Sequence, residues 1–431
     1  MYLYSRLMKS HKQINVGIVG CGKFISMFLS QSQSLKSICI NTIVDIDIKK
    51  AKANCFNACL KKNIISFINF SKDINDIIEN NTIDIVIEAT GNAKVGILNA
   101  IKVIKSKKNI IMVNVEADVV GGKYLSDLAS KHNVVYSMAY GDQPSLILEQ
   151  IEWGLINGFD VIAAGKGTKY HPSFKESTPE TVWYHYGIKK EVALSSGMNS
   201  KIFNSFITGD KSSIEMVAVA NASHLNFPKT GLQYPAVGVN DISKTLIPKN
   251  LGGVLENSYQ VEVISSINAN KEIIDDNLRW GVFVVIKARN SYVKDSFKQY
   301  GINTDTTGFY SALWRPYHYI GLELAQSIYS IALKNEPTGQ TKFYKADVAT
   351  IAKKNLTKGE KLDGEGGFTV RGEGVSSQFS KKNNILPLGL SDGLTVKEDI
   401  KKNSLITLGM VETNFPEDIK IARDYQYSLI R

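Results

Sequence analysis

The stretch INVGIVGCGKFISMF, residues 14–28, decides the fold. Its first six residues are an apolar run that predicts a buried strand, and the residues after Gly22 carry the spacing of an amphipathic helix. Gly20 permits a tight turn between the two, and Gly22 lets backbone approach a pyrophosphate at the helix N-terminus. Ile25 stands where a third glycine completes the usual pattern. We interpret the stretch as a dinucleotide-binding turn; a glycine turn of another α/β fold is the alternative.

An acidic residue at the end of the next strand strengthens this interpretation. Asp45 closes ICINTIV, 23 residues after Gly22. Its carboxylate suits the ribose hydroxyls and favours NAD(H), whereas Lys49 or Lys50 could neutralise a 2′-phosphate and favour NADP(H). A helix N-cap is the structural alternative for Asp45. These residues leave the choice between NAD(H) and NADP(H) open.

Strands and helices alternate over the first 140 residues. Apolar runs predict six strands, at residues 14–19, 38–44, 64–68, 83–89, 109–115 and 133–139. Near-continuous apolar strands separated by helices indicate a parallel sheet that is covered on both faces. We therefore predict an α/β protein with an N-terminal doubly wound Rossmann sheet.

Polar loops follow the later strands of this sheet. Ligands of open α/β sheets bind at the carboxyl edge of the strands, so we expect these loops to form a cofactor and substrate rim. A loop at residues 141–143 follows the sixth strand in the same way. The predicted cofactor-binding residues are Gly20, Cys21, Gly22, Lys23, Phe24, Asp45, Ala89, Thr90, Gly91, Asn92, Asn114 and Glu116.

Three domains are predicted from the change of pattern along the chain. Residues 1–142 form the Rossmann domain. Residues 143–340 mix strands and helices and suggest an α+β catalytic domain. Residues 341–431 contain short apolar runs between glycines and lysines, which suggests a small β-rich domain.

Composition bounds the function. The 431 residues carry a net charge of +10 that is spread along the chain, without a basic stripe of interleaved aromatics, so nucleic acid is not an expected partner. A mildly basic surface attracts small anionic substrates. Apolar runs are too short for a signal peptide or a membrane span, so we expect a cytoplasmic protein without membrane contact. We also expect a homo-oligomer. Cys55 and Cys59 are predicted to share one buried helix face.

Several polar residues in the middle of the chain are candidates for chemistry. In ITGDKSSIEM, Lys211 precedes Ser212 and Ser213, which open a helix, and the group suits a phosphate or carboxylate. A serine N-cap beside an exposed lysine is the alternative. Lys166, between two glycines of AAGKGTKY, could polarise a carbonyl or transfer a proton. The alternative is a surface lysine without a catalytic role.

Two more candidates precede a later helix. In RPYH, Arg315 could bind an anion bidentately, and His318 could act as acid or base or be a packed histidine. Arg279 is a weaker candidate. Glu215 could ligate a metal, but no carboxylate cluster completes the site, so the need for a divalent metal stays open.

Longer motifs carry a resemblance to known families. GCGKF, EATGN, VNVEADV and YGDQPS resemble the homoserine dehydrogenase-like oxidoreductases. AAGKGTKY, TPETVWYHYG, FNSFITGDKSSIEMVAVANA, LRWGVFV and RPYHYIGLEL are most similar to their 1-deoxy-D-xylulose 5-phosphate reductoisomerase-like (DRL) group. LDGEGGFTVRGEG is similar to the small SAF domain that closes such chains.

The resemblance implies an NAD(P)H-dependent oxidoreductase that acts on a sugar-phosphate-like carbonyl compound. In the reductoisomerase version a ketose phosphate rearranges to an aldehyde, which is then reduced. Lys166, His318 and Lys211 are the residues expected to polarise the carbonyl, move a proton and hold the phosphate. Hydride transfer on an alcohol without rearrangement is one alternative, and a cofactor-sensing sugar-binding protein is another. The resemblance favours NADP(H).

Overall fold

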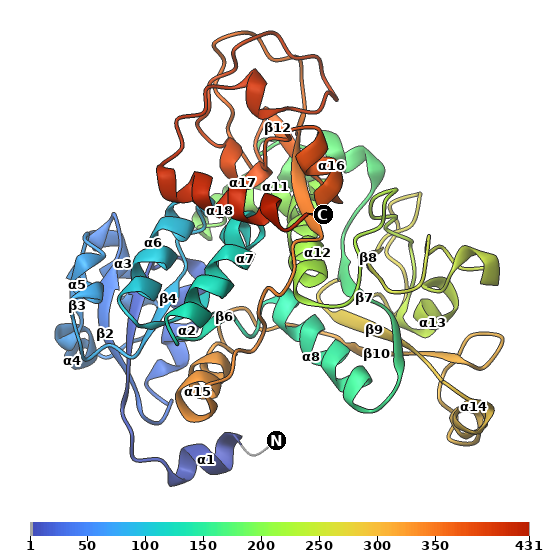
Figure 1. Ribbon diagram of the computed structural model, residues 1–431, viewed down its shortest axis with the longest axis horizontal. Coiled ribbons are helices and arrows are strands. Elements are labelled where there is room, and N and C mark those ends of the chain that lie inside the picture. The colour runs from blue at the N-terminus through green and yellow to red at the C-terminus, as the bar shows by residue number, and fades with distance from the viewer. Residues whose placement is uncertain (1–2, 431) are drawn as a thin grey trace. The chain divides into compact units, whose positions relative to one another are not determined.

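A computed structural model describes residues 3–430, which divide into two units (Figure 1). The first unit holds the chain up to Leu146, together with His318–Lys342 and Pro416–Gln426. The second holds Ile147–Tyr317, Phe343–Phe415 and the residues from Tyr427 onward. Residues 318–342 and 416–426 thus belong to the first unit although they come late in the chain. The division into three domains stays a prediction.

Six parallel strands form the sheet of the first unit, in the order β3-β2-β1-β4-β5-β6. They are β1 (Ile14–Val19), β2 (Ile38–Val44), β3 (Asn69–Ser71), β4 (Ile85–Glu88), β5 (Asn109–Met112) and β6 (Tyr136–Met138). The strand order reverses beside β1, which pairs with β2 on one side and β4 on the other. This is the doubly wound topology that the apolar runs predicted, and its ligand edge lies at the carboxyl ends of β1 and β4.

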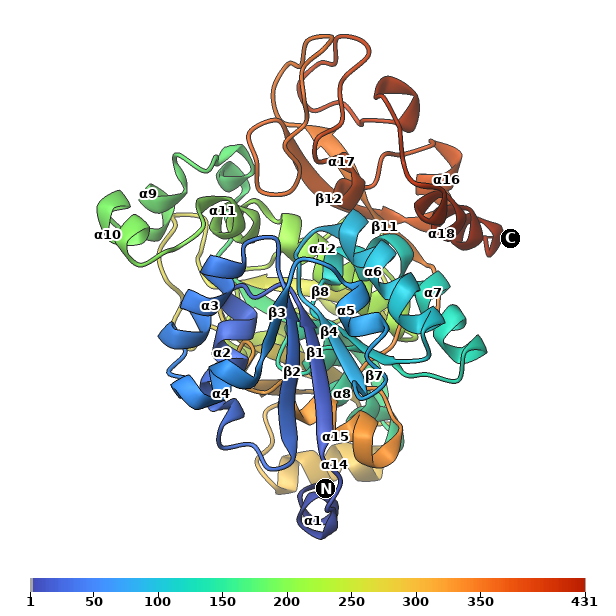
Figure 2. The ribbon, with the colours of Figure 1, turned by 90° about the vertical axis from the view of Figure 1, so that its left-hand side faces the viewer.

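Helices cover both faces of this sheet (Figure 2). One core joins α2 (Lys23–Ser32), α3 (Ile48–Asn57) and α15 (Ala325–Lys334), with Ile25, Phe28 and Ile328 fully buried in it. On the other face, α6 (Ala93–Lys105) and α7 (Val115–Lys131) pack on each other and against the later strands. Burial of Ile328 and its neighbours explains why α15 belongs to this unit although it comes late in the chain.

The predicted third strand is wrong. Residues 64–68 lie mostly in α4 (Lys62–Phe67), and the strand follows at β3. A short apolar run has the same composition in a strand and in a buried helical turn, so periodicity could not separate them. Of the run, Ile65 faces the core, while Phe67 is exposed.

The predicted pairing of two cysteines on one helix face is also wrong. Helix α3 ends at Asn57, and Cys59 lies beyond it with φ 61° and an exposed side chain. Cys55 is fully buried. The helix therefore ends before Cys59, so the two thiols do not share a helix face.

The second unit is built on a mixed sheet with the order β10-β9-β7-β8. Its strands are β7 (Asp160–Thr168), β8 (Gln260–Ser265), β9 (Val282–Lys287) and β10 (Tyr310–Arg315). Only β7 and β8 are parallel; the other pairs are antiparallel. Helix α12 (Asp210–Ala222) lies against β7 and β8 and against the hairpin of β11 (Ala346–Ala352) and β12 (Val370–Ser376) (Figure 1). This is the α+β arrangement that the sequence predicted.

The C-terminal part contains a small antiparallel sheet of β11 and β12, in line with the predicted β-rich character. Other short apolar runs pair through isolated bridges, such as Ile351 with Leu405. The chain ends in α18 (Glu417–Ser428). The remaining elements are α1 (Leu3–Lys9), α5 (Asn75–Ile78), α8 (Gln143–Ile156), η1 (Pro172–Glu176), α9 (Val182–Tyr186), α10 (Lys190–Ser195), α11 (Ser200–Thr208), η2 (Val239–Asp241), α13 (Ile242–Thr245), η3 (Lys249–Leu251), α14 (Ser291–Gln299), α16 (Ser377–Lys382), α17 (Leu388–Ser391) and η4 (Leu408–Met410). Within residues 3–430, every helix is too short or too polar to cross a membrane.

Candidate functional site

The two glycines after β1 have different structural roles. Gly20 has φ 87°, and a Cβ added there would lie 2.6 Å from the carbonyl oxygen of Ala89. Only glycine fits, because both the backbone conformation and the contact with the loop after β4 exclude a side chain. Gly22 has an ordinary φ of −81°, and a Cβ added there would meet no atom within 4 Å. The space above Gly22 is therefore open for a ligand.

The helix that follows this turn starts without a side-chain cap. Gly22 is the N-cap of α2 and offers no side chain to the first-turn N–H groups. In contrast, Asp47 caps α3, Asn92 caps α6 and Asn114 caps α7, each by accepting a backbone N–H. The open donors and the helix dipole at α2 suit an anion such as a pyrophosphate.

Asp45 holds the glycine turn against the end of β2. The Cys21 N–H donates to its Oδ2 at 2.8 Å, and the Asp47 N–H donates to its Oδ1 at 2.9 Å. Asn54 adds a second tie by donating from Nδ2 to the carbonyl oxygen of Cys21 at 2.7 Å. The N-cap of α3 is Asp47, so the structural alternative considered for Asp45 is wrong. Its carboxylate therefore organises the glycine turn.

Glu88 organises the loop after β4 and was missed from the sequence. Its Oε1 accepts hydrogen bonds from the Thr90 hydroxyl at 2.6 Å and the Thr90 N–H at 3.3 Å. Asn114 donates from Nδ2 to the Thr90 hydroxyl oxygen at 3.3 Å and to the Asn92 carbonyl at 3.0 Å. Burial raises the pKa of Glu88. The signal available in the sequence was an acid inside an apolar strand.

The other predicted cofactor residues are arranged around the same edge. Lys23 is exposed at the start of α2, and Glu116 lies in the first turn of α7. Phe24 is partly buried against the core. The thiol of Cys21 points inward, where a hydrogen bond with Cys55 and burial raise its pKa, so only the backbone of Cys21 faces the turn. The open space, free donors and nearby carboxylate fit a nicotinamide dinucleotide.

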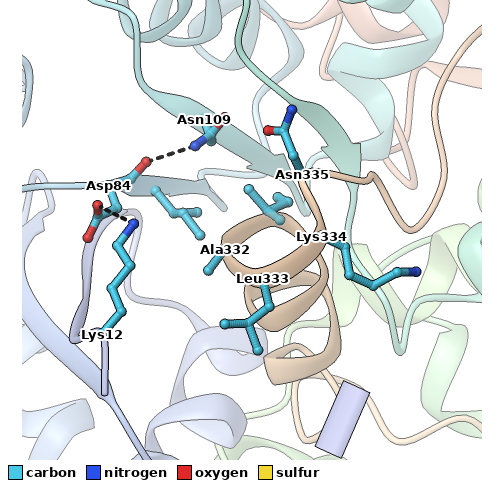
Figure 3. A pocket seen from close by; sticks show the side chains of 9 residues that line it. Lys12, Asp84, Asn109, Ala332, Leu333, Lys334 and Asn335 are labelled. Carbon is cyan, nitrogen blue, oxygen red and sulfur yellow. Dashed lines mark hydrogen bonds and ion pairs between the residues drawn. The ribbon is translucent and has the colours of Figure 1, made fainter. Parts of the chain in front are cut away.

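A pocket of ≈ 400 Å³ lies at the opposite edge of the sheet (Figure 3). It is bounded by the loop before β4, where Lys12 pairs with Asp84 at 3.3 Å, and by the end of α15 around Asn335. Both Asp84 and Asn109 stand at the amino ends of their strands. Because Rossmann sheets bind ligands at the carboxyl edge, this pocket is not the candidate cofactor site.

In the second unit, Lys166 and Glu215 form a buried ion pair. Lys166 lies on β7 with 5% of its surface exposed, and Glu215 lies on α12 with 3% exposed. Glycines flank Lys166 because neighbouring backbone comes very close. A Cβ on Gly165 would lie 1.7 Å from the Glu262 carbonyl, and one on Gly167 would lie 1.8 Å from the Leu278 carbonyl. The structure thus brings together two residues predicted separately.

The start of α12 is occupied by the chain's own groups. Gly209 has φ 92° and separates α11 from α12, and the buried carboxylate of Asp210 accepts the N–H groups of Gly366 and Gly372, each at 2.9 Å. Ser212 and Ser213 open the helix as predicted, but both are buried. Lys211 lies one turn before Glu215 on the same face of the helix. Its role as an anion handle stays a prediction.

Three groups beside this helix start were not predicted, of which Tyr170 and Glu262 are buried and Tyr234 is partly buried. The rings of Tyr170 and Tyr234 stack with centroids 3.8 Å apart, and the Tyr234 hydroxyl hydrogen-bonds to Ser213. Glu262 accepts the N–H groups of Gln233 and Val263, each at 2.9 Å, and burial raises its pKa to about 7. Tyr170 and Tyr234 lie in loops, where the sequence has no helix or strand periodicity that could predict this cluster.

The structure does not group the two residues of the RPYH motif in one unit. Arg315 is the last residue of β10 and belongs to the second unit, whereas His318 belongs to the first. The helix predicted to follow directly begins only at Ala325. Within residues 3–430, no group of three or more His, Cys, Asp or Glu side chains is arranged to hold a metal ion.

The middle of the chain is similar to a known family. Residues 141–324 match the family described as "Oxidoreductase DRL, catalytic domain". This range contains Lys166, Lys211, Glu215, Arg315 and His318, so the predicted catalytic residues all lie in a stretch similar to an oxidoreductase catalytic domain. No curated protein sequence matches the chain.

Solved structures with similar architecture were also found. Homoserine dehydrogenase of S. aureus is 15% identical, with 81% of this chain and 84% of that chain covered and a TM-score of 0.41. The yvaA protein of Bacillus subtilis is 13% identical, with coverages of 76% and 90% and a TM-score of 0.37. A levoglucosan dehydrogenase solved with NADH and levoglucosan is 13% identical, with coverages of 72% and 70% and a TM-score of 0.34. At these values the similarities carry no functional conclusion.

Proposed function

We propose that the chain is an NAD(P)H-dependent oxidoreductase that acts on a small anionic carbonyl compound, with a sugar phosphate as the first candidate. One observation carries the proposal: the uncapped start of α2 at Gly22 lies at the switch point of a 3-2-1-4-5-6 parallel sheet. The match of residues 141–324 to an oxidoreductase catalytic domain supports it.

The residues at the carboxyl edge of the first unit's sheet suit the parts of a nicotinamide dinucleotide. The first-turn N–H groups of α2 would bind the pyrophosphate, and Asp45 would face the adenosine ribose. Thr90 and Asn114, held by Glu88, would line the edge beside it. When bound, the nicotinamide supplies or accepts the hydride.

Lys166 is the proposed proton donor of the second unit. As a carbonyl carbon gains the hydride, its oxygen needs one proton to become an alcohol, and the Lys166 ammonium can give it. Glu215 holds the ammonium in place, and water returns to Lys166 the proton that it has given before the next turnover. In the oxidative direction both transfers reverse, so atoms and charge balance either way.

The substrate proposal rests on the resemblance of the middle motifs to the DRL group. A ketose phosphate that rearranges to an aldehyde before reduction is the reductoisomerase form. A homoserine dehydrogenase-like or sugar-alcohol reaction without rearrangement is the second form. We also propose that residues 341–431 are a SAF-like domain, and that the chain acts as a homo-oligomer.

Incubation with cofactor deuterated at nicotinamide C4 and a panel of ketose phosphates tests the proposal. We expect deuterium to appear in one product and to be lost in Lys166→Met. The carbon skeleton of the product separates rearrangement from simple reduction. Cofactor binding without deuterium transfer to any carbonyl compound would favour the sensor alternative, and absence of cofactor binding would refute the proposal.

A further inference from the structure

Two cations of the second unit are brought together at the end of β7. Lys169 follows this strand directly, and Arg279 lies in the loop before β9. Gly167 makes the approach possible, since a Cβ there would lie 1.8 Å from the Leu278 carbonyl and 3.1 Å from the Arg279 nitrogen. The Gly167 N–H also donates to the Gly281 carbonyl at 3.0 Å. The loop that carries Arg279 is therefore fixed on the strand that precedes Lys169.

Both cations contact the same aromatic ring. The Lys169 Nζ lies 5.8 Å from the centroid of Tyr186, and the Arg279 guanidinium carbon lies 5.5 Å from it. Arg279 also lies 4.6 Å from the ring centroid of Trp280 and hydrogen-bonds to the Tyr186 hydroxyl. Lys169 donates to the His185 carbonyl. A guanidinium has five N–H donors and an ammonium three, so each cation keeps donors for a ligand.

In the part of the chain that the structure describes, no acidic side chain neutralises these cations. Within residues 3–430, neither Lys169 nor Arg279 forms an ion pair with a carboxylate. Burial and then Arg279 lower the pKa of Lys169, and burial, Lys271 and Lys169 lower the pKa of His185. Lys169 and Arg279 thus repel each other, and the groups that contact them are aromatic side chains and a carbonyl oxygen. Lys175 of the same unit differs, because its ammonium meets Glu373 at 3.4 Å.

We propose that Lys169 and Arg279 form a binding site for a phosphate-type dianion. Arg279 would contact two oxygens with its planar fork, and Lys169 would add a point charge. Two cations match the charge of a dianion better than that of a singly charged carboxylate. The site itself needs no cofactor. The assignment of its anion to the substrate rests on the proposed function.

Titration of the full-length protein with inorganic phosphate at constant ionic strength tests this site. Tryptophan fluorescence and calorimetry report binding, with chloride as the non-specific anion. We expect Arg279→Gln and Lys169→Gln each to weaken phosphate binding about tenfold or more, because each removes one charge-assisted contact. Arg279→Lys should recover part of the loss. Lys287→Gln is the matched control, since Lys287 lies 5.5 Å from the ring centroid of Tyr310.

The variants also separate this site from the other anion sites. Phosphate binding should persist in Gly22→Val and in Lys211→Met. Unchanged binding in both Arg279→Gln and Lys169→Gln, with native melting curves, would overturn the proposal, and so would a loss confined to Lys211→Met. NADPH affinity, measured on the same proteins, should not change in Arg279→Gln. If wild type binds phosphate as described but no dinucleotide, the proposed function fails and the anion site stands.

Discussion

Lys166 on β7 and Glu215 on α12 meet as an ion pair with almost no exposed surface, although 49 residues separate them in the chain. The pair connects the mixed sheet to the central helix of the second unit. A buried pair stabilises a fold little relative to apolar residues, but loss of one partner leaves a charge without compensation. Both residues lie in the stretch that is similar to an oxidoreductase catalytic domain.

Removal of either partner should therefore destabilise the protein strongly. Lys166→Met and Glu215→Gln should each lower the free energy of unfolding by about 3–5 kcal/mol, and the double variant by much less than the sum. Urea unfolding at constant pH measures this. Under conditions where Lys166→Met remains folded, its turnover should fall far more than its substrate affinity. Additive losses would show that the two side chains do not interact.

The two glycines of the turn should fail in different ways. Gly20→Ala should lower stability by about 1–3 kcal/mol, because φ is 87° and the Ala89 carbonyl occupies the space of a Cβ. Gly22→Val should abolish dinucleotide binding and leave the melting temperature unchanged, because only open space surrounds a Cβ there. Calorimetry with NADPH and thermal unfolding report both effects. Normal cofactor affinity in Gly22→Val would contradict the Rossmann assignment.

Cofactor choice should depend on Asp45 and the lysines that follow it. We expect NADPH to bind at least tenfold more tightly than NADH, a difference of about 1.4 kcal/mol, if Lys49 and Lys50 offset the carboxylate. Asp45→Asn should widen this preference, since it removes a charge that repels the 2′-phosphate while an oxygen remains to accept the Cys21 N–H. Dissociation constants of both cofactors, measured on both proteins, decide the matter. A tenfold preference for NADH would instead support the direct interpretation of Asp45.

Because of the buried Asp118, the free energy of unfolding should fall as the pH rises from about 4 to about 6. Its carboxylate accepts hydroxyl hydrogen bonds from Tyr136 at 2.6 Å and Thr341 at 2.8 Å, and burial raises its pKa from 3.8 to about 6. Between these two pKa values, the carboxyl group of the unfolded chain loses its proton while that of the folded chain keeps it. The contribution of protonated Asp118 to stability is therefore fully present below pH 3.8 and is lost as the pH rises through about 6.

Comparison of wild type with Asp118→Asn isolates this contribution. From pH 5 to pH 7.5, wild type should lose about 1.4 kcal/mol of unfolding free energy that the variant does not lose, one pH unit being worth about that amount. Urea unfolding of both proteins at the two pH values measures it. A parallel pH dependence in both proteins would place the titration elsewhere.

Local sequence determined the first unit well. The glycine turn, the apolar runs at β1, β2, β4, β5 and β6, and the polar loops after them are all local patterns, and together they predicted the parallel sheet and its ligand edge. Locality also explains the errors. The run at residues 64–68 is equally apolar in a strand and in a helical turn, and the α3 pattern gave no sign that the helix ends before Cys59.

Tertiary structure alone decided which polar residues meet. Lys166 and Glu215 were each candidates from the sequence, but their pairing depends on α12 packing across β7. The proximity of Lys169 to Arg279 depends on backbone contact at Gly167, and Glu88 is significant only because Thr90 and Asn114 converge on it. A single sequence records periodicity within an element, and it contains no direct record of the long-range packing that sets distances between elements.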